Sequence, residues 1–195
     1  MKKSPLLLLV AVIALTPASA ALAADYTVDH SHSTVSFKIR HLFSKVQGEF
    51  KAFEGTFSYD ASDLSQWKAE AVVDAASIDT NTAKRDEHLR SKDFFDTAKF
   101  PSIMFKSTGA RDLTGRSAKL DGLLSIRGVE KPVTFDVEVH GEGTDPWGNT
   151  RLGLTATVTI NRKDFGLTWT ETLETGQLLV GEEVEITLEI EGLKK

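Results

Sequence analysis

The chain of 195 residues contains no cysteine. This absence excludes a disulfide scaffold, an iron–sulfur cluster and a thiol nucleophile. Proline is also scarce, with five residues, and no Pro-, Gly- or Ser-rich linker, low-complexity tract or internal repeat divides the sequence. A chain of this length without covalent cross-links is held together by its core, and its size suits one domain.

Positive charge is in short supply. The chain has 23 Lys and Arg against 28 Asp and Glu. Without Lys2 and Lys3 the balance is 21 against 28, a net charge of −7 with histidine neutral. This excess of acidic residues argues against nucleic acid or an anionic membrane surface as the main partner.

Long apolar runs are absent except at the N-terminus. There, Lys2 and Lys3 precede an apolar run from Leu6 to Leu15, and Ala21-Leu22-Ala23 follows it. This order is typical of a signal peptide, and the run is too short for a permanent membrane anchor. We therefore expect residues 1–23 to be removed and residues 24–195 to form a single soluble domain in the periplasm, with no stable membrane anchor.

Nearly all of the remaining sequence alternates between apolar and polar residues with a period of two. This pattern predicts strands that each have one wet face, as in antiparallel barrels and sandwiches. About eight long strands in roughly 170 residues fit an extended, lipocalin-like, up-and-down β-barrel of the all-β class. The apolar phase changes between Phe50 and Phe53, which predicts a bulge or bend. The alternation is clearest in residues 35–40, 53–59, 67–75, 119–127, 133–140, 152–160 and 183–191.

The inward-facing positions predict how the barrel is filled. Small residues recur among larger ones at Ala69, Ala71, Ala75, Gly122 and Ala156. They favour a cavity, although an interior in which small residues oppose large ones stays open as the alternative. We predict that a ligand in the barrel would be lined by Phe37, Phe105, Leu124, Phe135, Val137, Leu154 and Val158.

One segment, Asn81–Pro101, does not read as strand. Ala83–Arg90 is rich in helix formers and has Asn81 or Thr82 available as a cap, so it predicts a short helix within a helical insertion at about residues 82–95. Phe94 and Phe95 follow. We expect this insertion to close one end of the barrel and to offer Arg85, His88 and Arg90 to a polar head group. The alternatives are that Asp86 and Glu87 belong to a solvated helix face and that Arg85 forms an ion pair with Asp86.

Three further patterns bear on catalysis or metal binding. His30 and His32 are spaced to share one face of a strand, as metal ligands do, but hydrogen bonds to the backbone or to neighbouring polar groups explain them more simply. The charged cluster around Arg85 carries no nucleophile elbow or phosphate loop. In Asn161–Leu167 we expect a turn with Arg162 paired to a carboxylate. We predict no catalytic residue, no metal and no cofactor.

Several motifs together resemble the YceI-like, polyisoprenoid-binding periplasmic family. They are DHSHSTVSFKIRH (29–41), GEF (48–50), EGTF (54–57), RDEHL (85–89), FPSIMF (100–105), LLSIRGVEKPV (123–133) and INRKDFGL (160–167), which together span nearly the whole chain after residue 23. The resemblance implies a lipocalin-like barrel closed around a tunnel that holds an isoprenoid or another long-chain lipid, without catalysis. The alternative is a small exported metal-dependent or hydrolytic enzyme. The sequence does not decide between a monomer and a homodimer.

Overall fold

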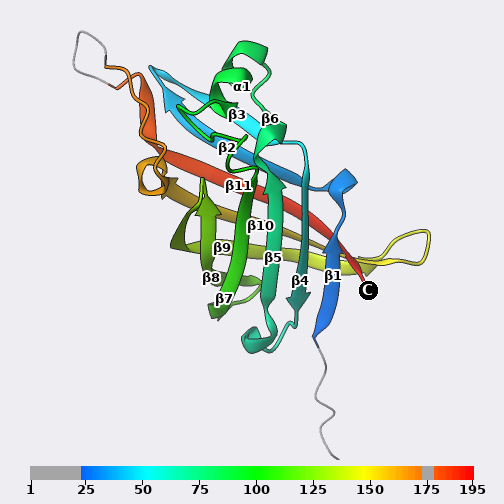
Figure 1. Cartoon of the computed structure of the whole chain (residues 1–195). Helices are drawn as coiled ribbons and strands as arrows, with labels where there is room; N and C mark the ends of the chain where they lie inside the picture. The colour runs from blue at the N-terminus through cyan, green and yellow to red at the C-terminus, as the bar shows by residue number, and fades with distance from the viewer. Residues whose placement is uncertain (1–22, 173–177) are drawn as a thin grey trace, which may run out of the picture.

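The computed structural model describes residues 23–172 and 178–195, so the expected leader lies outside the described residues except for Ala23. The described chain is built almost entirely of strands (Figure 1). The strands are β1 (Ala24–Val28), β2 (Thr34–His41), β3 (Ser44–Phe50), β4 (Phe53–Tyr59), β5 (Lys68–Asp74), β6 (Ile78–Asp79), β7 (Ser102–Thr114), β8 (Ser117–Ile126), β9 (Val129–Thr144), β10 (Thr150–Asn161) and β11 (Val180–Lys194). The described α-helix is α1 (Ala83–Arg90), and short 3-10 turns are η1 (His30–His32), η2 (Leu64–Gln66), η3 (Ala75–Ser77) and η4 (Arg162–Phe165).

The sheet closes on itself as an eight-stranded antiparallel barrel, which confirms the predicted fold class. Its ring runs β1-β4-β5-β7-β8-β9-β10-β11 and returns to β1. The long strand β11 pairs with β10 along one edge and with both β1 and β2 along the other. Strands β1 and β2 therefore follow one another along the same edge of β11, and the turn η1 separates them.

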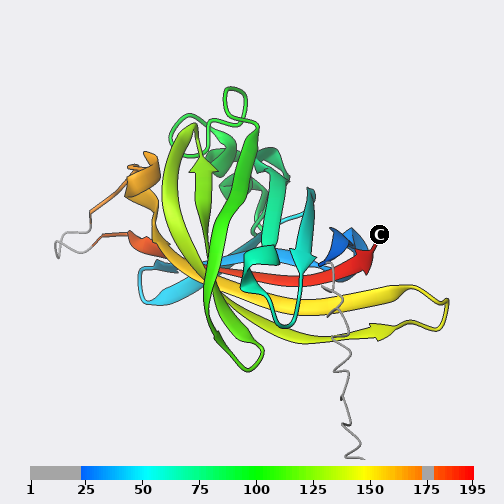
Figure 2. The same cartoon turned by 90° about the horizontal axis from the view of Figure 1, so that it is seen from below.

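A bend likewise separates β3 from β4, at the position where the apolar phase of the sequence changes. Strand β3 ends at Phe50 and β4 begins at Phe53. On either side of the bend, β3 pairs with β2 and β6, whereas β4 pairs with β1 and β5. The predicted bend is confirmed. Because of it, β2, β3 and β6 continue the wall beyond the ring as an extension at one end of the barrel (Figures 1 and 2).

The inserted segment lies at this extended end. Helix α1 has the predicted bounds, but its cap residue Thr82 makes no side-chain capping bond. The chain leaves the helix through a tight turn in which the Phe95 amide donates to the Leu89 carbonyl. Phe94 then packs with Leu124, Ile160 and Leu167 of the barrel wall. The insertion connects β6 to β7, which do not pair with each other.

The hydrophobic core has its two largest groups at opposite ends of the barrel. One contains Tyr26, Trp67 and Leu152, and the other contains Phe94, Phe165 and Leu167. No helix in the described part of the chain is long and apolar enough to cross a membrane.

Candidate functional site

The barrel encloses a cavity of about 590 Å³. This volume is in the usual range of small-molecule sites, and most of the lining residues are aliphatic or aromatic. The residues predicted to line the interior that do so are Phe37, Phe105, Leu124, Phe135, Val137 and Leu154. Val158 is not among the residues that line the cavity, and it packs against both large hydrophobic clusters.

The small interior residues have two different roles. Ala69, Ala71 and Ala156 line the cavity and leave it open. Gly122 does not line the cavity. A Cβ atom at this position would lie 2.4 Å from two ring carbons of Phe105. The glycine therefore lets the Phe105 ring lie flat against strand β8. In this way the sequence shapes the cavity wall as well as its volume.

Helix α1 contributes polar side chains to one end of the cavity. Lys84, Arg85 and His88 are among its lining residues, whereas Arg90 is not. The Arg90 guanidinium instead lies 3.4 Å from the Ala76 carbonyl oxygen in the η3 turn. Arg90 was therefore a wrong choice for the cavity end, because it faces the η3 turn.

The start of α1 is held by a buried carboxylate, contrary to the expected solvated face. Asp86 is 6% exposed and accepts hydrogen bonds from both the amide and the hydroxyl of Thr80. Arg85 forms no ion pair with Asp86. Its Nε donates to the Thr80 hydroxyl at 2.7 Å and its Nη2 donates to the Thr80 carbonyl at 2.6 Å. The helix packs against the end of β6, which buries the face that carries Asp86.

Aromatic rings surround His88. Its imidazole lies edge-on to Phe94 and to Trp169, with ring centroids 5.0 and 5.2 Å apart. Its Nε2 donates to the Asp93 carboxylate at 3.0 Å. Phe95 and Trp169 also line the cavity. Trp169 was missed by the sequence reasoning, because it lies in a segment without strand alternation and far from α1 along the chain.

Arg162 is the most deeply buried charged side chain in the cavity wall, with 2% exposure. The sequence predicted a carboxylate partner, and this is wrong. Its Nε donates to the Gly181 carbonyl at 2.8 Å, and its Nη1 donates to the Leu167 carbonyl. Its Nη2 is buried without a hydrogen-bond partner in the described chain. Burial lowers the pKa of Arg162 from its usual value, while Glu182 acts in the opposite direction through space.

Lys163, the residue after Arg162, pairs with a carboxylate instead. Lys163 Nζ lies 2.5 Å from Glu182 Oε1, and Asn161 accepts a hydrogen bond from the Lys163 amide. The predicted turn is present as η4, and Gly166 ends it in the left-handed conformation with φ at 75°. The turn thus sends Lys163 toward Glu182 and Arg162 into the barrel wall.

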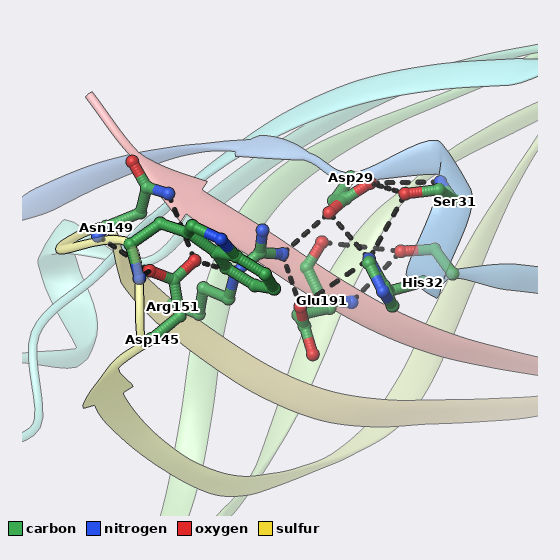
Figure 3. Close-up of polar contacts among 9 residues, drawn as sticks. Asp29, Ser31, His32, Asp145, Asn149, Arg151 and Glu191 are labelled. Atoms are coloured by element: carbon green, nitrogen blue, oxygen red, sulfur yellow. Dashed lines mark hydrogen bonds and ion pairs between the residues drawn. The ribbon is translucent and has the colours of Figure 1, made fainter.

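A second polar cluster lies away from the cavity, at the seam where β1 meets β11 (Figure 3). Arg151 Nη1 contacts Asp29 at 2.6 Å and Glu191 at 2.5 Å, and its Nε contacts Asp145 at 2.8 Å. These donors hold the pKa of Asp145 well below its usual range. The pKa of Asp29 is also well below its usual range, mainly because Ser31 and then Arg151 donate to it. Sequence reasoning missed this cluster, because its members come from four separate segments.

The two histidines of the His30–His32 pair separate. The turn η1 replaces the expected strand start, and His30 donates to the Lys51 carbonyl at 2.7 Å and stacks on Phe53. His32 donates to Asp29 at 2.8 Å. Asp29, His32 and Glu191 are close enough to hold a cation together. However, the guanidinium of Arg151 already contacts both carboxylates, so the cluster has its positive charge from within the chain.

Comparison with known proteins agrees with this architecture. The YceI-like domain family matches residues 26–192. A UPF0312 protein of Shewanella baltica is 40% identical over 198 residues, covering all of both chains. The crystal structure of BcnA from Burkholderia cenocepacia superposes with a TM-score of 0.75 at 26% identity, covering 84% of this chain and 98% of BcnA.

A more distant structure has the same fold. It is a polyisoprenoid-binding domain from Saccharophagus degradans implicated in plant cell wall breakdown. Its TM-score is 0.64 at 16% identity, covering 87% of this chain and 98% of that domain. The family match over residues 26–192 and the 40% identity to the Shewanella baltica protein establish that the chain belongs to the YceI-like family.

Proposed function

We propose that this chain is a non-catalytic binding protein for a polyisoprenoid or a similar long-chain amphiphilic lipid, held in the barrel interior. The observation that carries the proposal is the cavity of about 590 Å³, whose walls come from both hydrophobic clusters and one end of which is lined by polar side chains of α1. An apolar chain gains free energy from burial along such a wall. The distant relative named as polyisoprenoid-binding supports the same ligand class.

Export to the periplasm is part of the proposal. It rests on the order of basic, apolar and small residues in the first 23 positions, which is typical of a cleaved leader. The intact mass of the protein recovered from the periplasm would test it, since cleavage after Ala23 or Ala24 gives a defined product. Protein of full-length mass in that fraction would contradict export with cleavage.

An exported enzyme finds less support. The most metal-like group in the described chain, Asp29, His32 and Glu191, does not line the cavity, and Arg151 contacts both of its carboxylates. The acidic and histidine side chains near the seam therefore do not face an enclosed substrate space. We propose binding rather than catalysis.

Native mass spectrometry of freshly purified protein, followed by lipid extraction, tests lipid binding. We expect a stoichiometric lipid with a long alkyl or isoprenoid chain. A matched pair of variants controls for surface adsorption. Ala71→Phe fills the cavity, whereas Val72→Phe, at the next position on the outer face, leaves it open. Lipid should be lost only in Ala71→Phe, and equal loads in the two variants would contradict an interior site.

A further inference from the structure

The buried polar and charged side chains of the described chain fall into two groups. Thr80 and Asp86 satisfy each other through hydrogen bonds. Arg162 makes no contact with a carboxylate in the described chain, and it donates only to two backbone carbonyls. Among the described residues it therefore stands in the cavity wall as a buried cation with no carboxylate in contact.

Arginine keeps its charge in proteins even when burial opposes it. A buried charge is stabilised when an opposite charge lies in contact and its remaining hydrogen-bonding groups are satisfied. Neither condition is met in the described chain, because Glu182 is bound to Lys163 and Nη2 has no partner. An anionic oxygen in contact with Nη2 would supply both the opposite charge and the missing hydrogen-bond acceptor.

The position of Arg162 fits the end of the cavity that carries the other cations. Its Nη1 binds the Leu167 carbonyl, and Leu167 packs with Phe94 of the insertion. His88 of α1 contacts Trp169, two residues after Leu167. Charged residues elsewhere along the cavity are of mixed sign and exposed, namely Glu54, Lys68 and Glu70. The cavity thus has a basic end, which we define as Lys84, Arg85, His88 and Arg162.

We infer that Arg162 receives the anionic head group, a carboxylate or a phosphate, of an amphiphile whose chain fills the cavity. This assignment rests on the proposed lipid-binding function and adds the class of head group and its receptor. A charge-assisted hydrogen bond from a guanidinium to an anionic oxygen is stronger than one between neutral groups, so it discriminates between head groups. The apolar remainder of the wall binds the chain without such discrimination.

The test compares palmitic acid with hexadecanol, which have chains of the same length, on delipidated protein by displacement of a fluorescent fatty-acid probe. Wild type should prefer the acid by about tenfold or more, as expected for a hydrogen bond to a charged group. Arg162→Met should bind both ligands about equally and retain the affinity for hexadecanol. Arg90→Met removes a nearby guanidinium that does not line the cavity, so it should behave as wild type.

The possible results separate the two proposals. If wild type binds neither ligand nor any co-purified lipid, the proposed function fails. If wild type binds both and Arg162→Met keeps the full preference for the acid, the function stands and the role of Arg162 is overturned. Butyrate, which carries the carboxylate without the chain, should bind more than a hundredfold more weakly than palmitic acid, because most of its methylenes are missing. Equal binding of butyrate would overturn an amphiphile site.

A second measurement does not need a folded variant. In wild type labelled with ¹⁵N-arginine, the guanidinium resonances of Arg162 should shift when palmitic acid is added and should stay in place with hexadecanol. This readout reports contact with the head group and is independent of any loss of stability in Arg162→Met. Unchanged resonances with saturating palmitic acid would overturn the assignment.

Discussion

Two arginines lie at opposite ends of β10 and have opposite surroundings. Arg151, at the start of the strand, binds three carboxylates at the barrel seam. Arg162, directly after its end, binds two backbone carbonyls in the cavity wall. About eleven residues of strand separate them, roughly 35 Å of extended chain. Arg151 thus has three carboxylate partners, whereas Arg162 keeps one donor without a partner in the described chain.

The two ends also differ in packing. Beside Arg151, Leu152 is fully buried in the cluster of Tyr26 and Trp67 and does not line the cavity. Beside Arg162, Ile160 lines the cavity. Leu152 is therefore packed on all sides, whereas Ile160 borders the cavity. Substitutions at and around the two arginines test this difference.

The largest effect should come from Arg151→Ala. This change leaves Asp29, Asp145 and Glu191 close together with no cation between them, so the free energy of unfolding should fall more than for any other change considered. Arg151→Lys, which keeps the charge but loses the planar fork of donors, should be intermediate. Urea denaturation at neutral pH measures both. A midpoint for Arg151→Ala equal to that of wild type would show that the seam does not depend on this cluster.

The same cluster predicts the acid dependence of stability. Because the folded-state pKa values of Asp29 and Asp145 are lowered, their contribution is present above the unfolded pKa and is lost as the pH falls through the folded values. Wild type should therefore lose stability below about pH 4, near the ordinary pKa of aspartate. The difference between wild type and Arg151→Ala should narrow over the same range. A difference that stayed constant with pH would contradict the proposed electrostatic origin.

Truncations of apolar side chains along β10 come next. Leu152→Ala creates a void in a packed region and should cost about 2–5 kcal/mol in the free energy of unfolding. Ile160→Ala enlarges a space that already exists and should cost about 2 kcal/mol, at the lower end of the same range. Denaturant melts of lipid-free protein compare the two. Equal costs would indicate that the cavity end is as tightly packed as the seam.

The fold was predictable from the sequence where local rules decide the structure. The period of two predicted the strands, and the phase change predicted the bend between Phe50 and Phe53. The run of helix formers predicted the bounds of α1. These signals depend on neighbours along the chain. The apolar residues lining the cavity followed for the same reason, because alternation marks the inner face of each strand.

Partners of charged side chains were not predictable, since they depend on contacts between distant segments. Asp86 looked solvated among Lys84, Arg85 and Glu87, but it is buried and bound by Thr80, which directly follows β6. The Arg151 cluster has no local signature, because its carboxylates come from residues 29, 145 and 191. A sequence shows which residues carry charge, and the closed barrel decides which of them meet.

A smaller loss is expected at the buried anchor of α1, on the cavity side. Thr80→Val removes the hydroxyl that donates to Asp86 and accepts from Arg85. It should lower the free energy of unfolding by roughly 1–3 kcal/mol, because a buried carboxylate loses one of its donors. Thr80→Ser keeps the hydroxyl and serves as the control. A Thr80→Val protein as stable as wild type would mean that the Asp86 carboxylate is satisfied by the Thr80 amide alone.

The smallest effect concerns the charge next to Arg162. Lys163 neutralises Glu182, and Glu182 acts on Arg162 through space. Lys163→Met leaves the carboxylate of Glu182 unneutralised near the basic end, so it should repel an anionic head group. The affinity for palmitic acid should fall about twofold at low salt and recover as salt screens the exposed charge. The affinity for hexadecanol should not change, and Lys45→Met, which frees the exposed Glu185 elsewhere, should leave both unchanged. Equal weakening of acid and alcohol would assign the effect to altered packing of η4 rather than to charge at Arg162.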